Sequence, residues 1–139
     1  PGVGTTLPFL LSEGWLKGKL SLPRLLEASG AAQAARFGLS ARKGAIALGK
    51  DADLVLFDPK GRTTMRAERL YSKGRDTPFD GLGLQGSIRS VYLRGRLAYD
   101  AARDEERPGA LPREGSISEA APGVALEPGF GRFLSRGCP

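Results

Sequence analysis

The segment from Lys43 to Pro59, which reads KGAIALGKDADLVLFDP, constrains the fold of this chain more than any other part of it. Gly44 and Gly49 permit backbone angles that other residues resist, and Asp51 and Asp53 can accept hydrogen bonds from nearby amides. The apolar run LVLF that follows predicts a buried β-strand, and the Asp-Pro pair after it predicts the end of that strand. The segment therefore separates a helix-rich first third from a strand-rich middle.

The first third predicts three short helices, whose leucines and alanines recur at helical spacing. The first helix is expected to begin at a cap formed by Thr5 or Thr6, with Pro8 in its opening turn, and to end at Gly18. The second is expected to begin at a Ser21 cap. The third lies within residues 31–37 and ends at Gly38.

The middle of the chain predicts antiparallel β structure. After the strand at residues 54–57, the expected elements are a short strand at 62–66, a turn of helix at 67–71, an irregular loop around Phe79, and two strands at 88–93 and 96–99 that flank a tight Arg94-Gly95 turn. Residues 101–139 contain five prolines and six glycines, and only Phe130 and Phe133 are suited to docking. This tail is expected either to wrap the protein or a neighbouring subunit, or to be disordered.

Five motifs in this order resemble the end of the barrel and the start of the small β domain in metal-dependent cyclic amidohydrolases, a group that includes allantoinases, hydantoinases and dihydroorotases. They are PGVGTTLPFLL at 1–11, ARFGL at 35–39, the Lys43 segment, SKGRDTPFDGLGLQG at 72–86, and SVYLRGRLAYD at 90–100. The resemblance implies an α/β fold with the last helices of a (β/α)8 barrel followed by part of a small antiparallel β-sandwich domain. It implies three regions: barrel helices at 1–42, sandwich at 43–100, and a Gly/Pro-rich tail at 101–139.

The chain contains no histidine. The resembled family builds its site from several histidines, a lysine that is usually carbamylated, and an aspartate at the last barrel strand, which together activate a bridging water. The resemblance therefore implies a C-terminal fragment that starts just after the last catalytic residue and holds no catalytic group and no metal ligand. Zinc or another divalent metal is expected in the parent enzyme only. Pro1, Gly2, Val3 and Gly4 are expected to line the rim of the substrate site in a loop after the last barrel strand.

By this resemblance, the parent enzyme uses metal-activated water to hydrolyse a C–N bond in a small cyclic amide or ureide, and it is expected to be a homo-oligomer. Allantoinase is favoured because the run from Leu7 through SEGWLKGKLSLPRLL into RKGAIALGKDADLVLFDP most resembles that branch. Dihydroorotase is next, through SKGRDTPFDG, and hydantoinase is the remaining branch. The alternative from another class is a non-catalytic accessory or oligomerisation module, or a truncated reading frame without activity.

Other candidate sites have plainer interpretations. Asp51 and Asp53 could chelate a cation but are more typical of turn and cap groups. Ser72-Lys73 could be a nucleophile and its activator, but neighbours on an extended chain point to opposite faces. Lys43 and Lys50 could bind phosphate, although their glycine-rich turn leads into a strand and not a helix.

Charge, apolar run length and cysteine content argue against several other classes of protein. The net charge of +6 is scattered along the chain without aromatic interleaving, which argues against nucleic-acid binding. Apolar runs fall well short of the roughly 18 residues of a membrane span, so no membrane partner is expected. Cys138 cannot form a disulfide within the chain and lacks a histidine to activate it, which favours a reducing, cytoplasmic setting and argues against a nucleophile.

Overall fold

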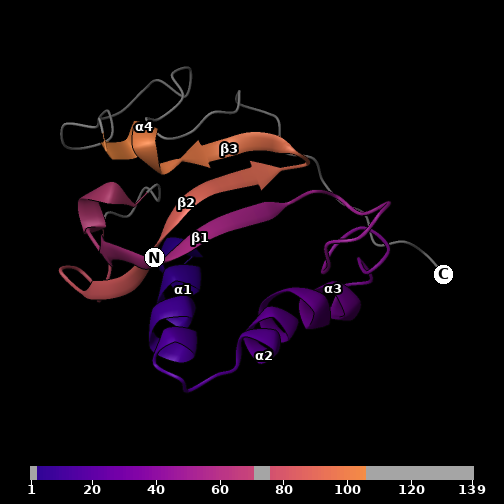
Figure 1. Ribbon diagram of the computed structural model, residues 1–139, viewed down its shortest axis with the longest axis horizontal. Coiled ribbons are helices and arrows are strands. Elements are labelled where there is room, and N and C mark those ends of the chain that lie inside the picture. Colours follow the sequence, from indigo (N-terminus) through magenta and orange to yellow (C-terminus); the bar gives the residue numbers. More distant parts are fainter. Residues whose placement is uncertain (1–2, 71–75, 106–139) are drawn as a thin grey trace.

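The computed structural model describes residues 3–70 and 76–105, in which two helical stretches precede an antiparallel sheet (Figure 1). The helical elements are α1 (Val3–Phe9), η1 (Leu10–Leu16), α2 (Leu22–Leu26), η2 (Glu27–Ala31), α3 (Ala32–Arg36), η3 (Ala67–Arg69) and α4 (Ala101–Glu105). The strands are β1 (Leu54–Thr64), β2 (Gly83–Leu93) and β3 (Arg96–Asp100).

The first helical stretch runs through α1 into η1, a π-helical segment, and ends as predicted at Gly18, which has a φ of 71°. The predicted cap at Thr5 or Thr6 is wrong, because the chain is already helical at Val3. Thr5 is the third residue of α1 and is only 2% exposed. Pro8 is within α1, where it lacks an amide hydrogen, and the wider turn of η1 follows directly.

The second stretch joins α2, η2 and α3 into one helical run, where the sequence had predicted two separate helices. Its ends are as predicted. The Ser21 hydroxyl accepts a hydrogen bond from the Arg24 amide at 3.3 Å, and Gly38 follows the last turn with a φ of 68°. The π-helical turn η2 bridges the expected break, and within it the Ser29 hydroxyl donates to the Leu25 carbonyl at 2.7 Å.

The strands form a sheet of order β1-β2-β3 in which both pairings are antiparallel, as predicted. The tight turn between β2 and β3 is confirmed at Arg94 and Gly95, whose φ angles are 50° and 77°. Two successive positive φ angles are typical of the type I′ turn, which matches the twist of a hairpin. The predicted helical turn after residue 66 is also present, as η3.

Strand β1 corrects two predictions, since it passes through Asp58-Pro59 and absorbs the separate strand expected at 62–66. Its pairing moves from Asp58 opposite Ser87 to Arg62 opposite Gln85, so more residues of β1 than of β2 fill the same interval. This is a bulge, and a bulge tolerates proline because the extra residues need not donate to the ladder. The Asp-Pro pair therefore bends the strand and does not end it.

The first helical stretch packs against the sheet. Ser12 of η1 is fully buried, and its hydroxyl accepts a hydrogen bond from the Gln85 amide of β2 at 3.0 Å. The Trp15 and Phe57 rings lie 6.2 Å apart between centroids, which joins η1 to β1. A hydroxyl bond and an aromatic contact thus fix this end of the helical region to the sheet.

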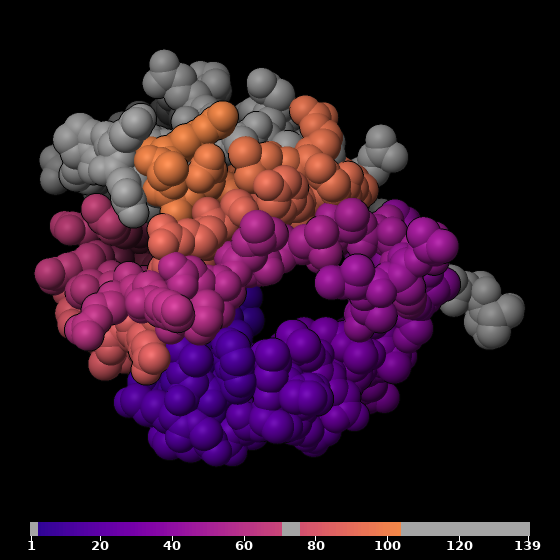
Figure 2. All heavy atoms as spheres, viewed as in Figure 1, coloured from indigo at the N-terminus to yellow at the C-terminus, as the bar shows by residue number. Residues whose placement is uncertain are grey.

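The buried hydrophobic side chains are few: Leu11, Leu25, Ala34, Met65 and Leu84. The predicted burial of the LVLF strand is wrong for its centre, since Val55 is 44% and Leu56 is 47% exposed. β1 is the edge of the described sheet, and Figure 2 shows an opening between the sheet and the α2–α3 helices. Within the described ranges, no helix combines the length and apolar character that crossing a membrane requires.

Candidate functional site

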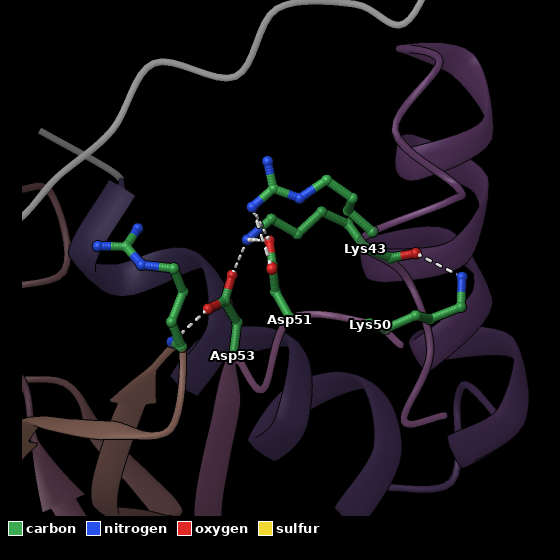
Figure 3. A network of polar contacts seen from close by, with 6 residues as sticks. Lys43, Lys50, Asp51 and Asp53 are labelled. Carbon is green, nitrogen blue, oxygen red and sulfur yellow. Dashed lines mark hydrogen bonds and ion pairs between the residues drawn. The ribbon is translucent and has the colours of Figure 1, made fainter. Parts of the chain in front are cut away.

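The loop that joins α3 to β1, residues 37–53, holds a cluster of charged side chains that we call the clasp: Arg42, Lys43, Asp51 and Asp53 (Figure 3). The Lys43 ammonium lies between the two carboxylates, 2.9 Å from Asp51 Oδ2 and in close contact with Asp53 Oδ2. The Arg42 guanidinium lies 3.1 Å from Asp51 Oδ1 and 3.0 Å from Oδ2. Two cations thus share two anions across the loop.

The clasp also reaches the hairpin turn of the sheet. Asp53 Oδ1 accepts a hydrogen bond from the Arg94 amide at 2.8 Å, and the Ala52 carbonyl accepts one from the Gly95 amide at 2.9 Å. These bonds satisfy amides in a turn whose positive φ angles expose them. The clasp therefore attaches the end of the helical region to the sheet at a second place, away from Ser12.

Electrostatics keep the clasp charged at neutral pH. The hydrogen bond from Lys43, and next that from Arg42, hold the pKa of the Asp51 carboxyl below its ordinary value. Partial burial lowers the pKa of the Lys43 ammonium, but its hydrogen bonds to Asp51 and Asp53 outweigh burial and leave that pKa raised. Asp51 Oδ2 is buried and lies 2.9 Å from the Lys43 ammonium and 3.0 Å from the Arg42 guanidinium, so two ion pairs neutralise it.

Backbone bonds and one glycine hold the loop against the helices. Gly44 has a φ of 88°, and a Cβ there would lie 2.8 Å from the Ala34 Cβ and 3.1 Å from the Ala31 Cα. The Lys50 ammonium donates to the carbonyls of Ser40 and Lys43, the latter at 3.3 Å. The glycine at position 44 is therefore required both for its angle and for the close approach to η2 and α3.

The contacts in this loop show what surrounds four of the predicted candidate site residues. Asp53 accepts a hydrogen bond from the Arg94 amide, which is the turn role that the sequence favoured over chelation, whereas the Asp51 carboxylate faces the cations of Arg42 and Lys43. Lys43 and Lys50 are held by carboxylates and backbone carbonyls, so neither is oriented as a free phosphate-binding cation. In residues 3–70 and 76–105 there is no group of three histidine, cysteine or acidic side chains able to hold a metal ion.

The remaining candidates lie elsewhere. Val3 and Gly4 form the first turn of α1 and not a loop, and Val3 is 96% exposed. Their place at a substrate rim stays a prediction, and Pro1 and Gly2 lie outside the described residues. The Ser72-Lys73 pair and Cys138 also lie outside them.

A shallow hollow of about 260 Å³ lies where β2, β3 and α4 meet. Its charged lining residues already have partners: the Arg89 guanidinium is 2.8 Å from Asp58 Oδ2, and Asp100 Oδ1 accepts from the Ala102 amide at 3.1 Å. The arrangement of this hollow suits the support of the sheet end better than binding of a charged ligand.

Sequence reasoning missed Arg42 and the hairpin amide of Arg94 as partners in the clasp. A signal for Arg42 was present, since the two cations Arg42-Lys43 precede the glycine turn and the two acids follow it. Nothing in the local sequence marked the bond between Asp53 and Arg94, which are 41 residues apart.

A model of the amidohydrolase family matches residues 11–99 of the chain. The chain belongs to the amidohydrolase family. The matched range of this amidohydrolase contains the clasp, strands β1 and β2, and all but one residue of both η1 and β3.

Individual relatives narrow the branch to the cyclic amidohydrolases. The chain is 31% identical to an L-hydantoinase of Paenarthrobacter aurescens over 97% of its own length and 25% of that protein. It is 39% identical to an allantoinase of Solibacter usitatus over 71% of its length and 21% of that protein. The solved L-hydantoinase (dihydropyrimidinase) of Arthrobacter aurescens matches with a TM-score of 0.67 and 36% identity, over 70% of this chain and 22% of that one. This amidohydrolase therefore spans about a quarter of the length of these relatives.

Amidohydrolases depend on metal, and the residues present here do not fit a metal centre. The chain has no histidine, and the paired aspartates of the clasp are already neutralised by Arg42 and Lys43. No step of metal chemistry can be assigned to the described side chains of this amidohydrolase.

Proposed function

We propose that this chain is the carboxyl-terminal quarter of a hydantoinase-type enzyme, which hydrolyses a ring C–N bond of a cyclic amide or ureide. The catalytic groups and the metal belong to the part of the enzyme that this chain does not match. In this proposal, residues 1–42 complete the barrel, residues 43–100 form part of a small β domain, and residues 101–139 extend over the enzyme or a neighbouring subunit.

The observation that carries the hydantoinase assignment is the extent of the match. The L-hydantoinase alignment covers 135 residues of this chain, which leaves only four outside and so includes most of the segment after Glu105. The allantoinase alignment covers 99 residues. The tail is thus a feature shared with the hydantoinase, and it moves our preference away from allantoinase, which the motifs alone had favoured.

Allantoinase is the second candidate, because one observation supports it. The 39% identity to the Solibacter allantoinase over its 99 aligned residues exceeds the 31% identity to the L-hydantoinase. Both candidates open a cyclic ureide or amide ring, so they differ in the substrate and not in the class of reaction.

The role of the described residues in this function is to position and not to react. Ser12 and the clasp attach the helical region to the sheet at two separate places. If Val3 and Gly4 lie at the substrate rim, these two attachments set where α1 begins relative to the sheet. The quarter-length chain would then act as a rigid support for one edge of the site.

A chimera tests this proposal. The matched quarter of the L-hydantoinase is replaced by this chain, and in a second chimera the matched quarter of the Solibacter allantoinase is replaced in the same way. We expect the metal-loaded hydantoinase chimera to open hydantoin, and the 139-residue chain with zinc to open neither hydantoin nor allantoin.

Three results would overturn the proposal in different ways. Activity restored only in the allantoinase chimera would move the chain to that branch. Failure of both chimeras, with each parent enzyme active under the same conditions, would refute the role as a working quarter of either enzyme. Turnover by the isolated chain would refute our account of where the catalytic groups lie.

A further inference from the structure

The turn between Gly44 and Gly49 exposes the most accessible large aliphatic side chains of the loop that carries the clasp. Ile46 is 90% exposed and Leu48 is 104% exposed, so neither contacts the rest of the described chain to any useful extent. Isolated exposed aliphatic residues are ordinary, but these two lie on one short segment, which we call the aliphatic turn (residues 44–49).

The aliphatic turn is held in shape despite this exposure. Gly44 and Gly49 both have positive φ angles, of 88° and 84°. The Lys50 amide donates to the Ala47 carbonyl at 3.2 Å, and the Asp51 amide donates to the Arg42 carbonyl at 2.9 Å, which closes the turn at its base. The two side chains are thus presented on a turn whose backbone is closed at its base, which reduces the backbone entropy lost when they are covered.

The charges beside the aliphatic turn are satisfied within the loop. Arg42 and Lys43 are paired with Asp51 and Asp53, and the Lys50 ammonium is held by backbone carbonyls. A partner therefore need not bring acidic groups to this surface. An apolar recess that receives two aliphatic side chains is the complement that the exposed atoms require.

We propose that the aliphatic turn docks through Ile46 and Leu48 into the body of the parent amidohydrolase, the three quarters of the relatives that this chain does not match. This inference rests on the proposed function. The turn lies inside the range matched by the family, and the relatives carry that range in one polypeptide with the remaining body.

The small size of the contact favours docking onto the body of the parent enzyme over binding to a second copy of the chain. A stable interface between separate proteins uses roughly 20–30 residues on each side. Two aliphatic side chains provide far less, but a contact of this size suffices when both surfaces are tethered in one polypeptide, because tethering raises their effective concentration.

The test uses the hydantoinase chimera described above and the 139-residue chain, each with and without the pair Ile46→Ser and Leu48→Ser. The matched control is the pair Ala45→Ser and Ala47→Ser, which adds the same hydroxyls to exposed positions of the same turn. We expect the Ile46/Leu48 pair to lower the melting temperature of the chimera by about 5 °C, since two aliphatic side chains lose their burial. The same pair should leave the melting temperature of the isolated chain unchanged, and the control should be silent in both.

Other results of this experiment would contradict either the docking contact or the proposed function. An equal loss in the chimera and the isolated chain would show that the turn packs on this chain itself, including its tail, and would overturn the proposal. Self-association of the isolated chain that the Ile46/Leu48 pair abolishes in sedimentation would assign the turn to a second copy. An active chimera whose stability ignores the substitutions would refute the docking contact alone, whereas an inactive unsubstituted chimera would count against the proposed function.

Discussion

Replacing Gly86 by alanine tests a close approach between β2 and β1. Gly86 has a φ of 86°, and a Cβ built there would lie 2.1 Å from Cζ of the Phe57 ring and 2.7 Å from its Cε2. The ring cannot remain where it is at such distances, and it is the ring that contacts Trp15 of η1. The substitution therefore perturbs both the backbone and the contact between helix and sheet.

The expected loss of folding free energy in Gly86→Ala has a backbone part and a side-chain part. Holding an alanine at a left-handed angle costs about 1–2 kcal/mol, and the smaller entropy of the unfolded alanine chain returns about 0.4–1 kcal/mol of this. Full burial of a phenylalanine contributes about 1.5–3 kcal/mol, so displacing the half-buried Phe57 ring costs about 1 kcal/mol more. We expect Gly86→Ala to lower the free energy of unfolding by about 2 kcal/mol.

Alanine substitutions at two other glycines separate the backbone cost from the cost of displacing the Phe57 ring. Gly81 has a φ of 79° with open space around it, so Gly81→Ala carries only the backbone cost of about 1 kcal/mol. Gly83 has neither a positive φ nor a close neighbour, so Gly83→Ala should not lower stability. Urea unfolding of the 139-residue chain, followed by the fluorescence of its single tryptophan, Trp15, measures all three. Equal losses for Gly86→Ala and Gly81→Ala would refute the close approach of Phe57.

Three further predictions address the cap of α2 and the attachments between the helical region and the sheet. Ser12→Ala removes the acceptor of the part-buried hydrogen bond from the Gln85 amide and should cost about 0.5–1.5 kcal/mol, with faster hydrogen exchange at that amide as the direct measurement. Ser21→Ala removes the cap of α2 and should cost about 1 kcal/mol in the same urea assay. An unchanged urea midpoint would show that the cap does not contribute to stability. The stabilisation from Asp51, whose pKa is lowered on folding, should be present above the ordinary carboxyl pKa and be lost as the pH falls through the lowered value. That from Lys43, whose pKa is raised, should be present below the ordinary lysine pKa and be lost as the pH rises through the raised value. An NMR titration in which Lys43→Met leaves the pKa of Asp51 where it was would contradict this pairing.

Features encoded by short-range chemistry could be predicted from the sequence. The cap at Ser21, the glycine ends at Gly18 and Gly38, and the Arg94-Gly95 turn depend on side-chain oxygens and backbone angles within a few residues. The resemblance of ordered motifs to the cyclic amidohydrolases was likewise enough to place the family.

What could not be predicted depends on partners distant in sequence. Pro59 signalled a strand end, but the pairing of β1 with β2 turned it into a bulge. The LVLF run signalled burial, yet burial requires a covering element, and Val55 and Leu56 have none among the described residues. The Asp53 bond to the Arg94 amide links residues that no local pattern relates.

The bulge at Pro59 has a consequence for the chain on its own. The outer edge of β1 offers amide and carbonyl groups to any strand that comes alongside, which is the usual route to intermolecular stacking. Beyond Phe57, however, proline supplies no donor and the extra residues twist the edge out of line. Along this edge, recruitment of a foreign strand is thereby confined to the stretch from Leu54 to Phe57, which is shorter than the roughly six or seven residues of a typical stacking segment, so the irregularity opposes fibril formation through β1.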